Sequence, residues 1–167
     1  MQAIAAMSEN RVIGLNGGIP WRIKEDFQWF KSFTLGKAII IGRKTFDTLP
    51  PLKDRGIFVL ARDNNPNLWR KTGRIIENPF GALGSFISVD DIPLDGIVAG
   101  GAQIYELLLP HCEELYLTLV KGQFEGDTYM PPFEHLFPYQ CLVRAHEKFS
   151  IVRYFKTLNP AFPENNC

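Results

Sequence analysis

The chain has 167 residues, of which 46% are hydrophobic, 22% charged and 13% aromatic, with 18 basic and 18 acidic residues. This composition is typical of a single globular domain and excludes a disordered chain. A net charge of zero provides no overall field for binding nucleic acid or an anionic membrane surface, and no uncharged apolar run approaches the roughly 20 residues that span a bilayer. We therefore expect a soluble, cytoplasmic protein with no nucleic-acid or membrane partner, and a monomer by default.

Apolar runs between turn residues predict eight strands, at 2–7, 37–42, 56–61, 73–76, 95–101, 114–120, 139–146 and 151–158. Helical patterns lie at 24–34, 43–49, 79–87 and 102–109. The last two strands alternate as in a hairpin, with a turn near 148–150. This order predicts an α/β fold: one domain with an eight-stranded, mixed but mostly parallel twisted sheet, a C-terminal antiparallel hairpin and four flanking helices.

Segment 8–23, between the first strand and the first helix, has no clear period. It contains Asn16-Gly17-Gly18 and an Ile19-Pro20 bond. A segment of this length is either an ordered functional loop or a simple connector, and the pattern alone leaves both open.

Asp26 stands out in the first predicted helix, "WRIKEDFQWFK". Phe30 and Phe33 follow it by four and seven residues, so all three share one helical face. Burial there would raise the pKa of the acid and make it a strong receptor for a ligand with paired N–H donors. The alternative is a solvated acid that favours the helix dipole, which suits Glu25 better.

Two strand-to-helix turns carry glycine. Gly42 is followed by Arg43 and Lys44, and Gly100-Gly101 precedes the helix at 102–109. Free backbone N–H groups at a helix start, with cations beside them, can bind phosphate. Each turn could equally be a structural glycine turn whose basic residues are simply solvated. The standard dinucleotide, phosphate-loop, hydrolase and zinc motifs are all absent from the sequence, so no metal is predicted. Together these patterns indicate a small nitrogen-rich heterocycle and a phosphate-bearing cofactor.

The chain resembles the dihydrofolate reductase family over about residues 1–158. The matching stretches are "IAAMSENRVIGLNGGIPWRIKEDFQWFK" (4–31), "IIIGRKTFDTLP" (39–50), "FVLAR" (58–62), "IVAGGAQIYELLLP" (97–110) and "LYLTLVKGQFEGDTYMP" (115–131), in the family's order and spacing. The resemblance implies an adenosine-binding subdomain at about 37–105, and it leaves "NPAFPENNC" (159–167) as a loosely docked C-terminal tail.

The resemblance implies NADPH-dependent reduction of 7,8-dihydrofolate to 5,6,7,8-tetrahydrofolate, which supports one-carbon and thymidylate metabolism. Antifolates such as trimethoprim and methotrexate would be inhibitors. Two alternatives remain: a pyrimidinone reductase of riboflavin synthesis with the same fold, and a non-catalytic NADPH-binding module.

Site residues follow from the same resemblance. Asp26 would bind the pterin and support its protonation, Trp21 would hold an ordered water, and Thr118 would support the acid. The substrate-binding set is Ile4, Ala6, Asp26, Phe27, Phe30, Thr48, Leu49, Leu52, Arg55, Ala99, Tyr105 and Thr118, with Arg55 on the glutamate tail. The NADPH-binding set is Ala6, Ile13, Gly14, Ile19, Gly42, Arg43, Lys44, Thr45, Leu60, Ala61, Arg62, Gly100, Gly101, Ala102, Gln103, Ile104 and Tyr105.

The resemblance also predicts backbone features and two departures. Segment 8–23 would be a lid over nicotinamide and substrate, latched by Asp127, and the Gly100-Gly101 bond would be cis. Ala99 stands where many members carry Ile or Val, so packing against small inhibitors should be weaker. Gln103 replaces a basic residue of several bacterial members, so recognition of the 2′-phosphate should depend more on Arg62.

Overall fold

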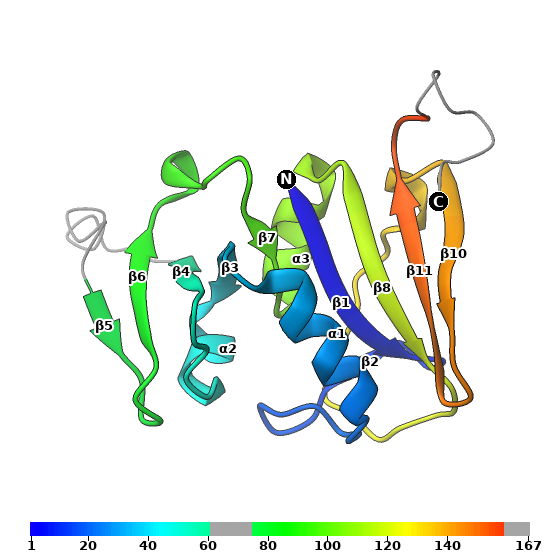
Figure 1. Cartoon of the computed structure of the whole chain (residues 1–167), viewed down its shortest axis with the longest axis horizontal. Coiled ribbons are helices and arrows are strands. Elements are labelled where there is room, and N and C mark those ends of the chain that lie inside the picture. Colours follow the sequence, from blue (N-terminus) through cyan, green and yellow to red (C-terminus); the bar gives the residue numbers. More distant parts are fainter. Residues whose placement is uncertain (61–74, 159–167) are drawn as a thin grey trace.

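The computed structural model describes residues 1–60 and 75–158, which form a nine-stranded sheet, a separate two-stranded ribbon and three α-helices (Figure 1). The strand order is β10-β11-β8-β1-β7-β3-β4-β6-β5. The bounds of these strands are β1 Gln2–Ser8, β3 Ala38–Gly42, β4 Gly56–Leu60, β5 Ile75–Glu77, β6 Leu83–Ile87, β7 Ile97–Val98, β8 Glu114–Val120, β10 Tyr139–Ala145 and β11 Phe149–Phe155.

The central strands β8, β1, β7, β3, β4 and β6 run parallel to one another, and antiparallel strands flank them on both sides. The helices are α1 Lys24–Thr34, α2 Arg43–Thr48 and α3 Ala102–Leu108. Short 3-10 helices lie at Val89–Asp91, Leu109–His111 and Glu134–Leu136. The ribbon pairs β2, Val12–Gly14, with β9, Thr128–Tyr129.

Alternate side chains of the parallel strands point to opposite faces of the sheet and build two apolar layers. Ile40 packs with the α3 residues Tyr105 and Leu108 on one face. Its neighbours Ile39 and Ile41 pack on the other face with residues of α1 and α2. The sheet is therefore covered on both sides, which explains why its parallel strands read as continuous apolar runs.

The predicted α/β fold class is confirmed, and each of the eight predicted strands is present. The helix predicted at 79–87 is wrong, because β6 occupies Leu83–Ile87 and pairs in parallel with β4 and antiparallel with β5. The described residues accordingly hold nine sheet strands and three α-helices. The final hairpin turns slightly earlier than predicted, since β11 begins at Phe149.

The side chain of Asn78 explains why no helix begins there. Its Oδ1 accepts hydrogen bonds from the backbone N–H groups of Phe80 and Ala82, at 3.0 and 2.9 Å. Gly81 follows with φ of +79°, a left-handed conformation that breaks a helix. These contacts turn the chain into β6.

Within the described ranges, no helix is long and apolar enough to cross a membrane. The same residues contain no group of three or more His, Cys, Asp or Glu side chains that could hold a metal ion.

Candidate active site

Four neighbouring strands bring their carboxyl ends to one edge of the sheet. Strands β8, β1, β7 and β3 are adjacent and parallel, so residues at their carboxyl ends lie together. Ala6 of β1 pairs with Thr118 of β8, while Gly42 ends β3 and Ala99 follows β7. In open α/β sheets, ligands bind outside the carboxyl ends of the strands. Most of the predicted site residues belong to this edge or to the segments that follow it.

Asp26, in the first turn of α1, is only 7% exposed. In the described part of the chain it is the only buried acidic residue. Burial raises the pKa of this carboxyl group, and the Thr118 side chain opposes part of that rise. The sequence-based prediction of a buried acid with a raised pKa is therefore confirmed. Glu25, the adjacent acid, is half-buried.

Two polar atoms of the predicted catalytic residues are buried without a hydrogen-bond partner in the described structure. They are the Thr118 hydroxyl and the indole Nε1 of Trp21, from residues that are 1% and 4% exposed. The Thr118 side chain nevertheless lowers the pKa of Asp26. Because buried polar groups usually have partners, each of these two atoms is suited to bind a polar ligand or an ordered water.

Phe30, Leu49, Leu52 and Ala99 form an apolar wall against strands β3 and β4. Phe30 of α1, Leu49 and Leu52 are partly buried and pack against one cluster built on β3 and β4, as does Ala99. Phe27, by contrast, is 47% exposed.

Arg55 is joined to the last residue of α1. Its guanidinium donates to the backbone oxygen of Lys53 at 3.0 Å and to the Thr34 hydroxyl at 3.4 Å. These bonds hold a planar cation near the C-terminal end of α1. Along α1 the structure thus places the buried acid Asp26 in the first turn, Phe30 one turn later and the Arg55 cation at the last residue, Thr34.

The two predicted glycine turns lie against each other. The N–H of Gly42 donates to the carbonyl of Gly100 at 2.8 Å, and the Gly100-Gly101 peptide bond is cis, as predicted. A Cβ on Gly42 would lie 2.9 Å from Ile104, and one on Gly101 would lie 3.2 Å from the Thr45 hydroxyl. Glycine at these two positions therefore avoids tight contacts with the side chains of Ile104 and Thr45.

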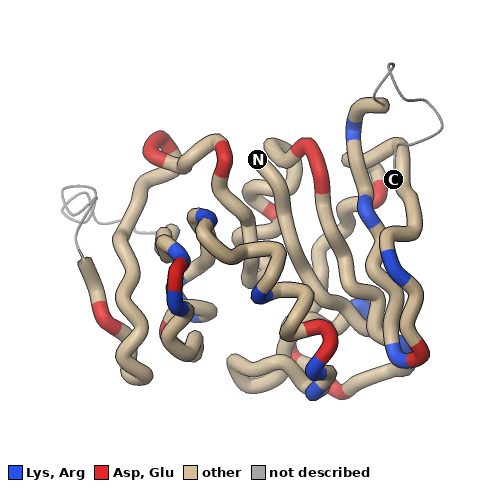
Figure 2. Tube along the Cα trace, viewed as in Figure 1, with Lys and Arg blue, Asp and Glu red and all other residues tan. Residues whose placement is uncertain are grey.

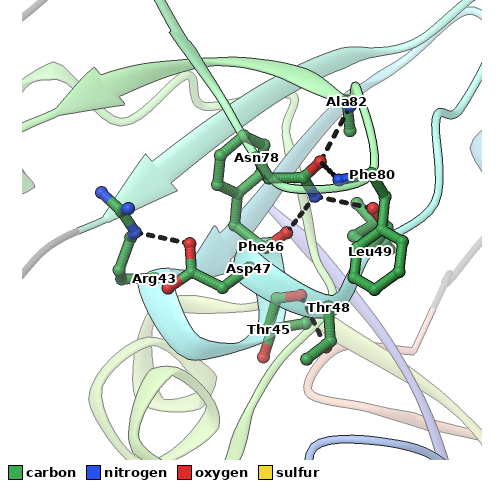
Figure 3. Close-up of polar contacts among 9 residues, drawn as sticks. All are labelled: Arg43, Thr45, Phe46, Asp47, Thr48, Leu49, Asn78, Phe80 and Ala82. Carbon is green, nitrogen blue, oxygen red and sulfur yellow. Dashed lines mark hydrogen bonds and ion pairs between the residues drawn. The ribbon is translucent and has the colours of Figure 1, made fainter.

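Charged residues are interleaved around α2 (Figure 2). Arg43 forms an ion pair with Asp47 at 2.7 Å, drawn in Figure 3, and its guanidinium lies 5.6 Å from the ring centre of Phe86. Lys44 is exposed. The predicted cations therefore flank the glycine turn, although Asp47 offsets part of the charge of Arg43.

Segment 8–23 contacts two distant parts of the chain, α2 and the segment around Asp127, which supports its interpretation as an ordered loop. Asn16 donates its N–H to the Asp127 carboxylate at 2.8 Å, and the N–H of Asp127 donates to the carbonyl of Gly14 at 3.1 Å. Gly17 comes so close to α2 that a Cβ there would lie 3.0 Å from the Thr48 methyl group. The backbone hydrogen bond from Asn16 lowers the pKa of Asp127.

Two further anchors of this segment were missed by the sequence analysis. The Asn10 amide exchanges hydrogen bonds with both backbone groups of Phe124, at 2.8 and 3.1 Å. Arg11 donates to the carbonyls of Met130 and Pro131 and to the Glu134 carboxylate. Nothing in the local pattern of "SENR" distinguishes these residues from those of an ordinary polar turn.

The remaining predicted positions are Tyr105, several residues of the cofactor set, and residues outside the described ranges. The Tyr105 hydroxyl donates to the Ile4 carbonyl at 2.7 Å, which ties α3 to β1. Described residues of the cofactor set range from buried to exposed; they are Ile13, Gly14, Ile19, Leu60, Ala102, Gln103 and Ile104. The predictions for Ala61, Arg62 and the tail at 159–167 lie outside the described residues.

Comparisons with known proteins agree with this geometry. A family model described as dihydrofolate reductase matches residues 1–154. A dihydrofolate reductase of Buchnera aphidicola subsp. Baizongia pistaciae is 35% identical over 158 residues, covering 93% of this chain and 89% of the relative. One from Staphylococcus haemolyticus is 38% identical over 129 residues, covering 77% and 74%.

Among solved structures, dihydrofolate reductase from Enterococcus faecalis complexed with NADP(H) and RAB-propyl superposes with a TM-score of 0.70. It is 28% identical in sequence, and the match covers 92% of this chain and 94% of that one. The family model, the sequence relatives and the structural match all point the same way: this chain belongs to the dihydrofolate reductase family.

Proposed function

We propose that this protein reduces 7,8-dihydrofolate to 5,6,7,8-tetrahydrofolate with NADPH. The observation that carries the proposal is the buried carboxyl group of Asp26 at the carboxyl edge of the sheet, between Thr118 and the apolar wall around Phe30. A folded protein keeps such an acid out of water only at a cost in stability, which favours a functional role.

In this proposal Asp26 accepts hydrogen bonds from the amino group and the neighbouring N–H of the pterin ring. Bonds to a charged acceptor strengthen where water is excluded, so the carboxylate selects this donor pair over other heterocycles. Thr118 supports the carboxylate. Phe27, Phe30, Leu49 and Leu52 contact the rings of the substrate, and Arg55 binds a carboxylate of the glutamate tail through its planar fork.

The glycine turns fit a dinucleotide. Gly42 and Gly100-Gly101 carry no side chains, so a bound group can come close to their backbones, and Lys44 follows Gly42 by two residues. NADPH, when bound there, supplies the hydride. Arg43, Lys44 and Thr45 would hold its pyrophosphate, and Arg62 its 2′-phosphate.

Protonation of the ring nitrogen beside the reacting carbon falls to Asp26 and Trp21. The carboxylate stabilises positive charge as it develops on the pterin, and the Nε1 of Trp21, which has no partner among the described residues, positions the water that delivers the proton. Closure of segment 8–23, latched by Asp127, excludes bulk water during the step.

Antifolates would compete for the Asp26 site, because a diaminopyrimidine ring presents the same paired donors. We also propose a monomer in the cytoplasm, supported by the balanced charge and the family. The adenosine of NADPH would contact the subdomain at about 37–105.

The test is loss of the near-ultraviolet absorbance of NADPH on mixing with dihydrofolate. Turnover with NADPH supports the proposal, and no turnover of dihydrofolate overturns it. Reduction of a ribosylated pyrimidinone instead would favour the riboflavin-pathway reductase. Binding of NADPH without turnover of either substrate would favour a non-catalytic module.

A further inference from the structure

Asn78 is a buried polar residue, and its side chain is only 5% exposed. It follows β5, at the end of the sheet opposite β10. The substrate and cofactor assignments above do not include it. Its contacts nevertheless lead directly to α2 (Figure 3).

All four hydrogen-bonding positions of the Asn78 amide are used. Its Nδ2 donates to the carbonyl oxygens of Phe46 and Leu49, at 2.5 and 2.7 Å. Its Oδ1 accepts from the N–H groups of Phe80 and Ala82. Two carbonyl oxygens surround the Nδ2 of Asn78 and two N–H groups surround its Oδ1. Exchanging the amide nitrogen and oxygen would therefore lose all four hydrogen bonds.

The two carbonyls lie at the C-terminal end of α2, where the helix itself leaves oxygens without partners. Leu49 is the residue after the helix, and its N–H donates to the Phe46 carbonyl. Asn78 thus closes this end of α2 from outside the helix. The turn at 78–82 acts as a fixed support for residues 46–49.

Packing of Phe46 reinforces the same attachment. Phe46 is fully buried, and a Cβ on Gly84 of β6 would lie 2.9 Å from its ring. The underside of α2 therefore sits directly on the β6 backbone. The amide of Asn78 and the ring of Phe46 together determine where the end of α2 lies.

The two ends of α2 face different ligands in the proposed function. Thr45, in the first turn, contacts Gly101 of the cofactor turn. Thr48 and Leu49, at the last turn, belong to the proposed substrate site, and Leu49 packs in the apolar wall with Phe30. A change confined to the C-terminal end should affect the substrate more than the cofactor.

We infer that Asn78 is a positioning residue for the substrate: by holding the carbonyls of Phe46 and Leu49, it places Thr48 and Leu49 against the part of dihydrofolate that follows the pterin. This inference rests on the proposed function. The pterin ring itself is held from α1 and β8, through Asp26 and Thr118. Asn78 should therefore matter little for a pterin that lacks the benzoylglutamate tail.

The decisive variant is Asn78→Asp. The new carboxylate can still accept from Phe80 and Ala82, but its second oxygen faces the carbonyl oxygens of Phe46 and Leu49 and repels them. Asn78→Ala, which removes both halves of the amide without adding charge, is the second variant in case the first does not fold. Leu115→Val, at the amino end of β8, is a buried control for general loss of stability.

Steady-state kinetics and intrinsic tryptophan fluorescence give the readouts. We expect both Asn78 variants to raise the KM and Kd for dihydrofolate about tenfold, with kcat and the Kd for NADPH changed less than about twofold. Their kcat/KM for a tail-less dihydropterin should stay within about twofold of wild type. Leu115→Val should leave all these constants unchanged.

Equal losses on dihydrofolate, NADPH and the tail-less dihydropterin would show a merely structural role and overturn the inference. An unchanged KM for dihydrofolate in both variants would also overturn it. Wild-type turnover of dihydrofolate is measured first, because its absence overturns the proposed function and this inference together. Normal wild-type turnover with unaffected Asn78 variants overturns this inference alone.

Discussion

Replacing Asp26 by Asn removes the buried negative charge of the candidate site and keeps the shape of the side chain. We expect kcat/KM for dihydrofolate to fall about 10²- to 10³-fold, because removing one preorganised electrostatic group at a reacting centre costs about 3–4 kcal/mol. The residue is only 7% exposed, so bulk water cannot replace the lost charge. The neutral amide also presents an NH₂ group to a ligand that offers donors.

The same substitution should make the protein more stable at neutral pH. Burial raises the pKa of Asp26 above 3.8, so the folded state holds its proton at pH values where the unfolded chain has lost it. Stability from this group is therefore full below 3.8 and declines as the pH rises through the folded-state pKa. An Asn side chain does not ionise, so burying it carries no such cost. The free energy of unfolding of Asp26→Asn should therefore not show this decline as the pH rises.

Two measurements check the prediction, namely the decay of NADPH absorbance with dihydrofolate and urea unfolding from acidic to neutral pH. Glu25→Gln is the matched control, since it neutralises the adjacent, half-buried acid of the same helical turn. That control should retain wild-type turnover. A loss of less than about tenfold in Asp26→Asn would contradict the catalytic role of the Asp26 charge, and a lower stability than wild type at neutral pH would contradict the raised pKa.

Two further substitutions test other parts of the site. Ala99→Ile adds apolar contact beside a partly buried wall and should tighten trimethoprim binding about tenfold, at roughly 0.8 kcal/mol per buried CH₂; equal inhibition constants in both forms would contradict this. Asp127→Ala removes the acceptor for the Asn16 N–H and should lower kcat about threefold in steady-state assays, whereas wild-type kinetics would show that the latch is not used. Because the pKa of Asp127 is lowered, the latch should persist at neutral pH and be lost only as the pH falls below 3.8.

The helix at Lys24–Thr34 agrees with its predicted range because its signals are local. Acidic residues begin it, the apolar positions recur at helical spacing, and Asp26 could be recognised as an acid on the packed face. The parallel strands can also be predicted from the sequence, since their apolar runs are continuous. These features need only the residues nearby.

At 79–87 the local pattern Asn78-Pro79 favours a helix start, although Gly81 and Gly84 in that stretch are poor helix formers. What decides the structure is distant: Asn78 binds the end of α2, and β6 pairs with β4. The anchors at Asn10 and Arg11 were missed for the same reason, because their partners lie more than a hundred residues away.

The position of β1 has a consequence for how the chain folds. Strand β1, the earliest of the described strands along the chain, lies between β7 and β8, which begin only at Ile97 and Glu114. The amino-terminal segment must stay unpaired while most of the polypeptide emerges, and contacts of such large sequence separation form slowly. A chain truncated after residue 109 should show no cooperative unfolding transition in urea, since the central strand would lack its longest pairing.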